Sequence, residues 1–237
     1  MNRIVVTSIV GAATAAALTL GACVPAFAST PTPAPKTPRT LASVQAKAAT
    51  ATSDRETKLS AEIAKITAAK GINSGDQATL LGRLNADLAG MKSTEAKIAA
   101  DTTLAAATAD FKTVFTTYRV YAVAIPQARI MAAVERATSL GLPRLTAEQT
   151  KLAGLLSGKD SGKSTPALQA DLSDMQTQIA SATSALNGVA AEVMAITPAD
   201  FNSNHSVVKS IRTSVKAAIA DVQKARADRK AIVSALK

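Results

Sequence analysis

The chain has 237 residues and a formal net charge of +10, and 52 of its residues are alanine, against 11 glycine, 9 proline, 4 Phe, 2 Tyr and no Trp. Because alanine is the best helix former and buries little apolar area, this composition favours thin, closely packed helices. It argues against β-sandwiches and barrels, which need β-branched and aromatic residues. A single Cys and a single His exclude a multi-disulfide scaffold and a Cys/His zinc cluster.

The first 28 residues have the features of a secretory signal peptide. Arg3 supplies a positive n-region, an uncharged apolar stretch runs from Ile4 to Ala22, and Ala26-Phe27-Ala28 matches an A-x-A cleavage motif. We therefore expect residues 1–28 to direct export, with cleavage before Ser29. A membrane anchor is the alternative, although no charged stop-transfer cluster follows the apolar stretch.

A second processing site is present within the same leader. Leu20-Gly21-Ala22-Cys23 resembles a bacterial lipobox, in which the cysteine becomes the lipidated first residue of the mature protein. In that case Cys23 anchors a lipoprotein to the membrane, whereas cleavage before Ser29 releases a protein without cysteine. Both outcomes place the protein outside the cytoplasm, either secreted or on the extracellular face of the cell envelope.

Residues 29–40 form a linker that contains four prolines and four threonines. Such a proline density favours extended polyproline II structure, with a rise of about 3.1 Å per residue. The linker is therefore expected to act as a spacer between the leader and the rest of the chain. A plain disordered N-terminus is the alternative interpretation.

Residues 41–237 are predicted to be helical almost throughout. The first helix is expected at 41–70, and Ser74 with Gln77 predicts a capping box at the start of the second. That helix is expected to run or bend through residues 101–103 toward Ile125. Pro126 predicts a kink or restart, Gly141-Leu142-Pro143 a break, and Thr146 with Gln149 another capping box. Residues 157–164 are rich in Gly, Ser and Lys and predict a loop.

Two apolar seams with heptad spacing predict the strongest helices, near 166–196 and 206–236. The first seam repeats at intervals of four and three and comprises Leu168, Leu172, Met175, Ile179, Ala182, Leu186, Val189, Val193 and Ile196. The second comprises Val208, Ile211, Val215, Ala218, Val222, Ala225, Arg229, Ile232 and Leu236, with an arginine inside the stripe. Together the patterns predict an all-α fold, an elongated antiparallel bundle with coiled-coil-like helix pairs.

The charges are distributed unevenly between the last two long helices. No Lys or Arg occurs from Ser164 to Val208, whereas Lys209 to Lys237 contains eight basic and two acidic residues. One interpretation is that the acidic and basic helices pair through complementary flanks. The alternative is that the basic helix binds a polyanion outside the cell, with Lys224, Arg226 and Lys230 as candidate contacts.

Motifs for catalysis, cofactor binding and metal binding are incomplete in this sequence. Gly162-Lys163-Ser164 resembles the end of a phosphate-binding loop, but the preceding Gly158 has the wrong spacing and a predicted helix precedes the motif. His205 alone cannot supply a di-iron site and lies at a helix start. We therefore expect no catalytic, cofactor or metal-binding residue and a protein that is not an enzyme. An envelope hydrolase would need two carboxylates held in a cleft.

Four of the aromatic residues outside the leader lie on one predicted helical stripe, between Phe111 and Tyr121. They are most simply explained as the widest part of the core, with tyrosine hydroxyls that reach polar partners. The alternative is a small groove at Pro126 that binds an anion or a partner. Its candidate contact residues are Tyr118, Arg119, Tyr121 and Arg129.

The segment TYRVYAVAIPQARIMAAVERA, at 117–137, resembles a recurring piece of uncharacterised alanine-rich secreted helical proteins of high-GC Gram-positive bacteria. Residues 101–104, 196–200 and 225–229 are similar to theirs as well. The resemblance implies secretion and helical structure, and it implies no activity. The Gly141-Leu142-Pro143 sequence departs from the uninterrupted helix expected at that place.

The features above predict an exported, non-enzymatic helical spacer or interaction protein of the bacterial cell envelope. The alternative is a binding module that uses its basic C-terminal helix on an anionic wall polymer or membrane surface. Its partner is expected to be a cell-wall polymer or another envelope protein, with a membrane involved in anchoring only if Cys23 is lipidated. Nucleic acid is not an expected partner, and the chain is expected to be a monomer or a homodimer.

Overall fold

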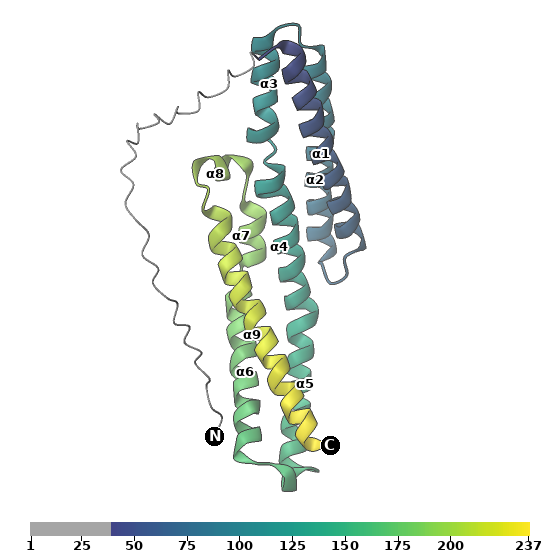
Figure 1. Cartoon of the computed structure of the whole chain (residues 1–237). Helices are drawn as coiled ribbons and strands as arrows, with labels where there is room; N and C mark the ends of the chain where they lie inside the picture. Colours follow the sequence, from purple (N-terminus) through teal and green to yellow (C-terminus); the bar gives the residue numbers. More distant parts are fainter. Residues whose placement is uncertain (1–38) are drawn as a thin grey trace, which may run out of the picture. The chain divides into compact units, whose positions relative to one another are not determined.

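The computed structural model describes residues 39–237. The predicted signal peptide at 1–28, Cys23 and nearly all of the linker at 29–40 lie outside the described residues. Every regular element within 39–237 is helical, so the all-α prediction is confirmed (Figure 1). None of these helices is long and apolar enough to cross a membrane.

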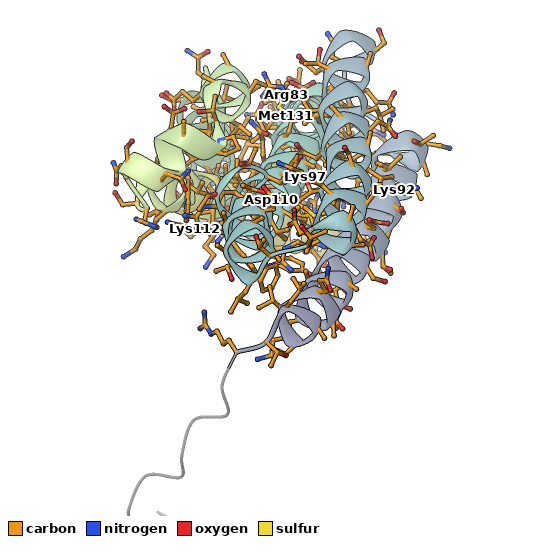
Figure 2. All side chains as sticks on the ribbon, turned by 90° about the horizontal axis from the view of Figure 1, so that it is seen from above. Arg83, Lys92, Lys97, Asp110, Lys112 and Met131 are labelled. Carbon is orange, nitrogen blue, oxygen red and sulfur yellow. The ribbon has the colours of Figure 1, made fainter. Side chains whose placement is uncertain are left out.

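The first three helices pack against one another. They are α1 (Leu41–Ala68), α2 (Ser74–Ala100) and α3 (Leu104–Thr116). Both the hairpin of α1 with α2 and the packing of α3 across it bury leucine, isoleucine and methionine side chains. Seen from above, Lys97 of α2 lies beside Asp110 of α3, with Nζ 3.0 Å from Oδ1 (Figure 2). This ion pair is at the surface, so apolar burial accounts for most of the stability of the packing.

Side-chain caps mark the boundaries between these helices. The predicted capping box of Ser74 and Gln77 is wrong, because Asn73 is the N-cap of α2 and accepts a hydrogen bond from Gly75 N. Gln77 instead donates through Nε2 to the carbonyl of Ile66, at the end of α1. The predicted bend at 101–103 is present, since α2 ends at Ala100 and Thr103 caps α3.

A long helical rod follows, and it begins at Arg119 rather than at Pro126. Arg119 has a φ of 44°, a left-handed conformation that separates α3 from the rod. The rod then continues without a break through the π-helical turn η1 (Val120–Ala124), α4 (Ile125–Arg136), the π-helical turn η2 (Ala137–Gly141) and α5 (Leu142–Ser157). The aromatic stripe therefore spans the junction between α3 and the rod.

The predicted break at Gly141-Leu142-Pro143 is therefore wrong, and so is the capping box at Thr146, whose hydroxyl donates to Leu142 O within α5. A proline in a helix removes a donor and crowds the carbonyl four residues earlier. Here a π-helical turn lies immediately before each proline, η1 before Pro126 and η2 before Pro143. The wider turn accommodates the ring, so helical structure continues past both prolines.

The remaining helices return along the rod. They are η3 (Ser161–Lys163), α6 (Pro166–Leu186), α7 (Val189–Ala195), α8 (Pro198–Ser203) and α9 (Val207–Leu236). The α6–α9 pair makes the most extensive helix contact, while α5 packs on both helices and α7 packs on α4 (Figure 1). Lys163 donates to Leu236 O and Ser181 to Asp221, which shows that α6 and α9 are antiparallel.

All nine positions of the first predicted seam are buried. The helix that carries them is nevertheless interrupted at Asn187-Gly188, where Gly188 has a φ of 75° and separates α6 from α7. Six of the nine positions in the α9 seam are also buried alanine, valine or isoleucine before Arg229, and Ile232 is buried after it. Burial follows the heptad pattern, whereas coiled-coil geometry stays a prediction.

Candidate functional site

Tyr118 and Arg119, two of the predicted groove residues, point to different helices. The Tyr118 hydroxyl lies 3.1 Å from Thr94 Oγ1 on α2, and its ring covers Gly90. Arg119 donates from Nε to Asn202 Oδ1 on α8 at 2.6 Å, and its guanidinium lies 5.4 Å from the Phe201 ring centroid. Both side chains therefore tie the start of the rod to neighbouring helices.

Tyr121 and Arg129 point to α1 at two separate places. The Arg55 guanidinium lies 5.0 Å from the Tyr121 ring and 4.5 Å from the Phe115 ring, a cation–π arrangement on a partly exposed surface. Arg129 instead donates hydrogen bonds to the buried carboxylate of Glu62, which lies more than one helical turn from Arg55 on α1. The structure thus does not bring the four predicted residues together in one groove.

A small cavity of about 230 Å³ lies where α2, the rod and the α7–α8 connection meet. Its polar side chains are those of Arg83, Asp87, Tyr118, Gln127 and Thr197. Burial raises the pKa of Asp87 to about 6, and Arg83 one turn away opposes the rise only in part. Arg83 donates a hydrogen bond to Met194 O at 2.6 Å. None of Arg83, Asp87 and Gln127 was predicted from the sequence as a site residue.

Groups suited to metal or acid–base chemistry do not gather in the described part of the chain. Within residues 39–237 no set of three His, Cys, Asp or Glu side chains is placed to hold a metal ion. His205 packs edge-on against Phe201, with ring centroids 4.9 Å apart.

The basic charges of α9 are not neutralised by α6. Among residues 39–237 no ion pair joins the two helices, so the prediction of complementary flanks is wrong. Burial raises the pKa of Asp228 on α9, and Asp171 and Asp174 of α6 raise it further because their charges lie nearby. Buried alanine, valine and leucine therefore account for the α6–α9 pairing, and charge attraction does not.

Only two of the eight basic residues of the last helix form ion pairs within the described chain. Lys224 bonds to Asp221 on its own helix at 3.1 Å, and Arg229 bonds to Glu148 on α5. The other six are exposed and have no carboxylate within ion-pair distance among residues 39–237. These six are Lys209, Arg212, Lys216, Arg226, Lys230 and Lys237.

These six residues share one face of α9. Positions repeating at intervals of three and four from 209 to 237 form a stripe beside the buried seam. The stripe, which we call the cationic stripe, comprises Lys209, Arg212, Lys216, Ile219, Gln223, Arg226, Lys230, Val233 and Lys237. At about 1.5 Å per residue it is about 40 Å long. Arg226 and Lys230, singled out from the sequence, belong to it, whereas Lys224 lies outside it.

No protein-family model matches this chain, and neither a curated protein nor a solved structure shows significant similarity to it.

Proposed function

We propose that this chain is an exported, non-enzymatic interaction protein of the bacterial cell envelope, and that it binds an anionic wall polymer through the cationic stripe of α9. The observation that carries the proposal is the alignment of six exposed cations, without carboxylate partners in residues 39–237, along one face of one helix. A linear polymer with regularly spaced anionic groups has the complementary form.

The arrangement of the stripe has an energetic cost in the isolated protein. Like charges three or four residues apart on a helix repel one another by about 0.2–0.5 kcal/mol per pair. Lys209, Arg212 and Lys216 make two such pairs, and Arg226 with Lys230 makes a third. A bound polyanion would attract these charges and offset the repulsion among them, so binding would compensate for the cost of placing the charges on one face.

The remaining features fit a protein that works outside the cell. The predicted signal peptide would export it, and the 12-residue linker would extend about 37 Å if it adopts polyproline II structure. The rod, α6 and α9 would then act as a coiled-coil-like support that presents the stripe to its surroundings. The proposal assigns no catalytic residue and no cofactor. Lipidation of Cys23 would add a membrane anchor without changing the stripe.

The experiment is co-sedimentation of residues 29–237 with purified cell walls at about 50 and 500 mM salt, which span weak and strong screening. We expect retention at low salt and release at high salt. The variant Lys209→Glu/Arg212→Glu/Lys216→Glu should lose retention at low salt. Its matched control is Lys47→Glu/Lys58→Glu/Lys70→Glu, which makes the same change in net charge away from α9 and should keep most of it.

Two results would count against the proposal. Retention that the α9 variant and its control lose equally would show a net-charge effect without a role for the stripe. Absence of retention at either salt would favour the spacer hypothesis, in which the helices only separate other components. Anionic and zwitterionic vesicles, tested in parallel, report whether the stripe prefers a membrane surface to a wall polymer.

A further inference from the structure

A hollow of about 440 Å³ lies between η2 with its flanks on the rod and the middle of α9. Leu140 and Ile219 form its apolar walls and remain 50% and 39% exposed, two of the five large hydrophobic side chains that are exposed in residues 39–237. Ala133, Ala137 and Val222 form the floor. This volume lies within the range of small-molecule sites, about 300–1,000 Å³.

The shape of the hollow follows from its residues. Ala133, Ala137 and Gly141 recur every fourth residue on the rod, so no long side chain fills the space opposite α9. Gly71 in the α1–α2 turn packs closely against Leu140, because a Cβ on Gly71 would lie 2.5 Å from Leu140 Cδ1. Ser139 also donates to Gly71 O at 2.6 Å. Three separate segments therefore fix the walls.

The rim of the hollow is cationic. Three arginines contribute to the lining, Arg136, Arg144 and Arg226, and no carboxylate does. Arg144 bonds to Glu148 in the next turn at 3.2 Å. Arg136 and Arg226 have no ion pair and no side-chain hydrogen bond with any other part of residues 39–237. Guanidinium groups are suited to bind carboxylate or phosphate through paired hydrogen bonds.

We infer that this hollow binds an anionic amphiphile, with the hydrocarbon chain between Leu140 and Ile219 and the acidic headgroup on Arg136 and Arg226. An inorganic anion would leave the apolar walls exposed to water. A neutral hydrocarbon would leave the arginines without an anionic partner. The hollow shares Ile219, Gln223 and Arg226 with the cationic stripe. The inference goes beyond the proposed function, because it concerns a small amphiphilic ligand and the residues of the rod that would bind it.

The neighbouring structure favours a short ligand over a partner helix. A second hollow of about 440 Å³ continues along the same side of α9, with Leu152, Leu155 and Val233 in its lining. The ion pair of Arg229 on α9 with Glu148 on α5 crosses the groove between the two hollows. A long helix lying in the groove would have to break this pair, whereas a single amphiphile occupies one hollow without contacting it.

The test is calorimetric titration of residues 29–237 with dodecyl phosphate below its micelle concentration. Inorganic phosphate and dodecyl maltoside serve as the headgroup-only and chain-only probes, and far-UV circular dichroism reports whether the fold is kept. We expect saturable binding of dodecyl phosphate, and affinities at least about tenfold weaker for each of the other two probes. Equal binding of inorganic phosphate or of the maltoside would overturn the inference.

Two matched pairs of variants locate the ligand. Arg136→Gln should weaken dodecyl phosphate binding by about tenfold, while Arg212→Gln, a remote arginine on the stripe, should leave it unchanged. Leu140→Ser should weaken it by a similar factor, while Leu104→Ser, at another exposed leucine on α3, should not. If Arg136→Gln and Leu140→Ser both bind as the unaltered chain does, the hollow is not the site.

The same proteins test two further points, where the amphiphile comes from and whether its binding is independent of polymer binding by the stripe. Flotation with phosphatidylglycerol vesicles, against phosphatidylcholine vesicles, shows whether the hollow takes a lipid from a bilayer or only a free amphiphile. The Lys209→Glu/Arg212→Glu/Lys216→Glu variant should lose wall binding and retain dodecyl phosphate binding. Loss of both together would show that the hollow and the stripe act as one site and would overturn the inference.

Discussion

Arg129 on α4 donates hydrogen bonds from Nε and Nη2 to the carboxylate of Glu62 on α1, with Nη2 3.0 Å from Oε2. The Glu62 side chain is only 3% exposed, whereas that of Arg129 is 59% exposed. The hydrogen bond to Glu62 raises the pKa of Arg129, so the guanidinium stays charged. This pair is a direct charged link between the first helices and the rod.

Arg129→Met is expected to lower the free energy of unfolding by about 2 kcal/mol. The substitution leaves the Glu62 carboxylate buried with only Lys65 at 3.6 Å, and the exposure of Arg129 reduces the cost from that of a fully buried pair. Urea denaturation measures the change. Glu62→Leu/Arg129→Met should recover most of the loss, because no charge remains buried. Lys65→Met is the control and should change stability by less than about 0.5 kcal/mol. A loss as large for the double variant as for Arg129→Met would contradict this explanation.

Gly90→Ala in α2 is expected to destabilise the protein by about 1–3 kcal/mol, against the usual preference of helices for alanine. A Cβ at this position would lie 2.6 Å from the Tyr118 ring, which must then move away from Thr94. Gly82→Ala in the same helix is the matched control, since nothing lies within 4 Å of its Cβ position. It should stabilise by about 0.5–1 kcal/mol. Thermal unfolding of the two variants should therefore shift in opposite directions, and shifts of the same sign would contradict the packing of Tyr118.

Asp87→Asn is expected to stabilise the protein at pH 7.5 and to have little effect near pH 4. Burial raises the folded-state pKa of Asp87 to about 6 from the ordinary 3.8. The folded state thus binds more protons than the unfolded state between these values, and the contribution of Asp87 to stability is full below pH 3.8 and is lost as the pH rises through 6. Asparagine imitates the protonated form. After allowance for solvent screening, the gain at pH 7.5 is about 1–2 kcal/mol.

Denaturation of Asp87→Asn and of the unaltered chain across pH 4–8 measures this difference. Asp54→Asn is the control, because Asp54 is exposed on α1. Its stability difference from the unaltered chain should stay small, because the side chain is exposed. A difference for Asp87→Asn that is the same at pH 4 and pH 7.5 would show that the carboxyl is not desolvated by the cavity.

The sequence predicted the helices and their buried faces better than it predicted their ends. Heptad spacing located Leu168 through Ile196 correctly, because burial follows the helical period whatever the neighbouring helix is. The break expected at Pro143 was wrong, and the restart expected at Pro126 coincides with the start of α4 at Ile125, where a π-helical turn keeps the chain helical. Such a turn before a proline leaves no signal in local spacing. Breaks occur instead at Arg119 and Gly188, where the backbone is left-handed.

The candidate sites were predictable only in part. The charge surplus of α9 was evident from the sequence, and Arg226 and Lys230 lie on the cationic stripe. Whether α6 would neutralise that surplus depends on which faces meet, and composition does not contain this information. The hollow beside Leu140 was not predicted, because it joins η2 to Ile219 across about 80 residues and depends on the turn at Gly71. The aromatic stripe was wrongly predicted to be the widest part of the core, because Phe115 and Tyr121 are exposed and contact Arg55 at the surface, while Phe111 and Tyr118 are half-buried.

The ends of three helices are closed by distant glutamines, and the strongest case gives the last prediction. Gln45, Gln77 and Gln127 donate from Nε2 to carbonyls in the last turns of α2, α1 and α7, each of which also accepts a hydrogen bond from the backbone N–H of its C-cap residue. Gln127 is buried and bonds to Val193 O at 2.6 Å and Ile196 O at 3.1 Å. Gln127→Leu should therefore cost about 1–3 kcal/mol, because it leaves Ile196 O without its side-chain donor and Val193 O with only the backbone N–H of Ile196. Hydrogen exchange should accelerate in α7 first, whereas Gln176→Leu on the exposed face of α6 should leave exchange in α7 unchanged. Uniform acceleration across all helices would mean that Gln127 contributes to the core as a whole and has no specific role in closing α7.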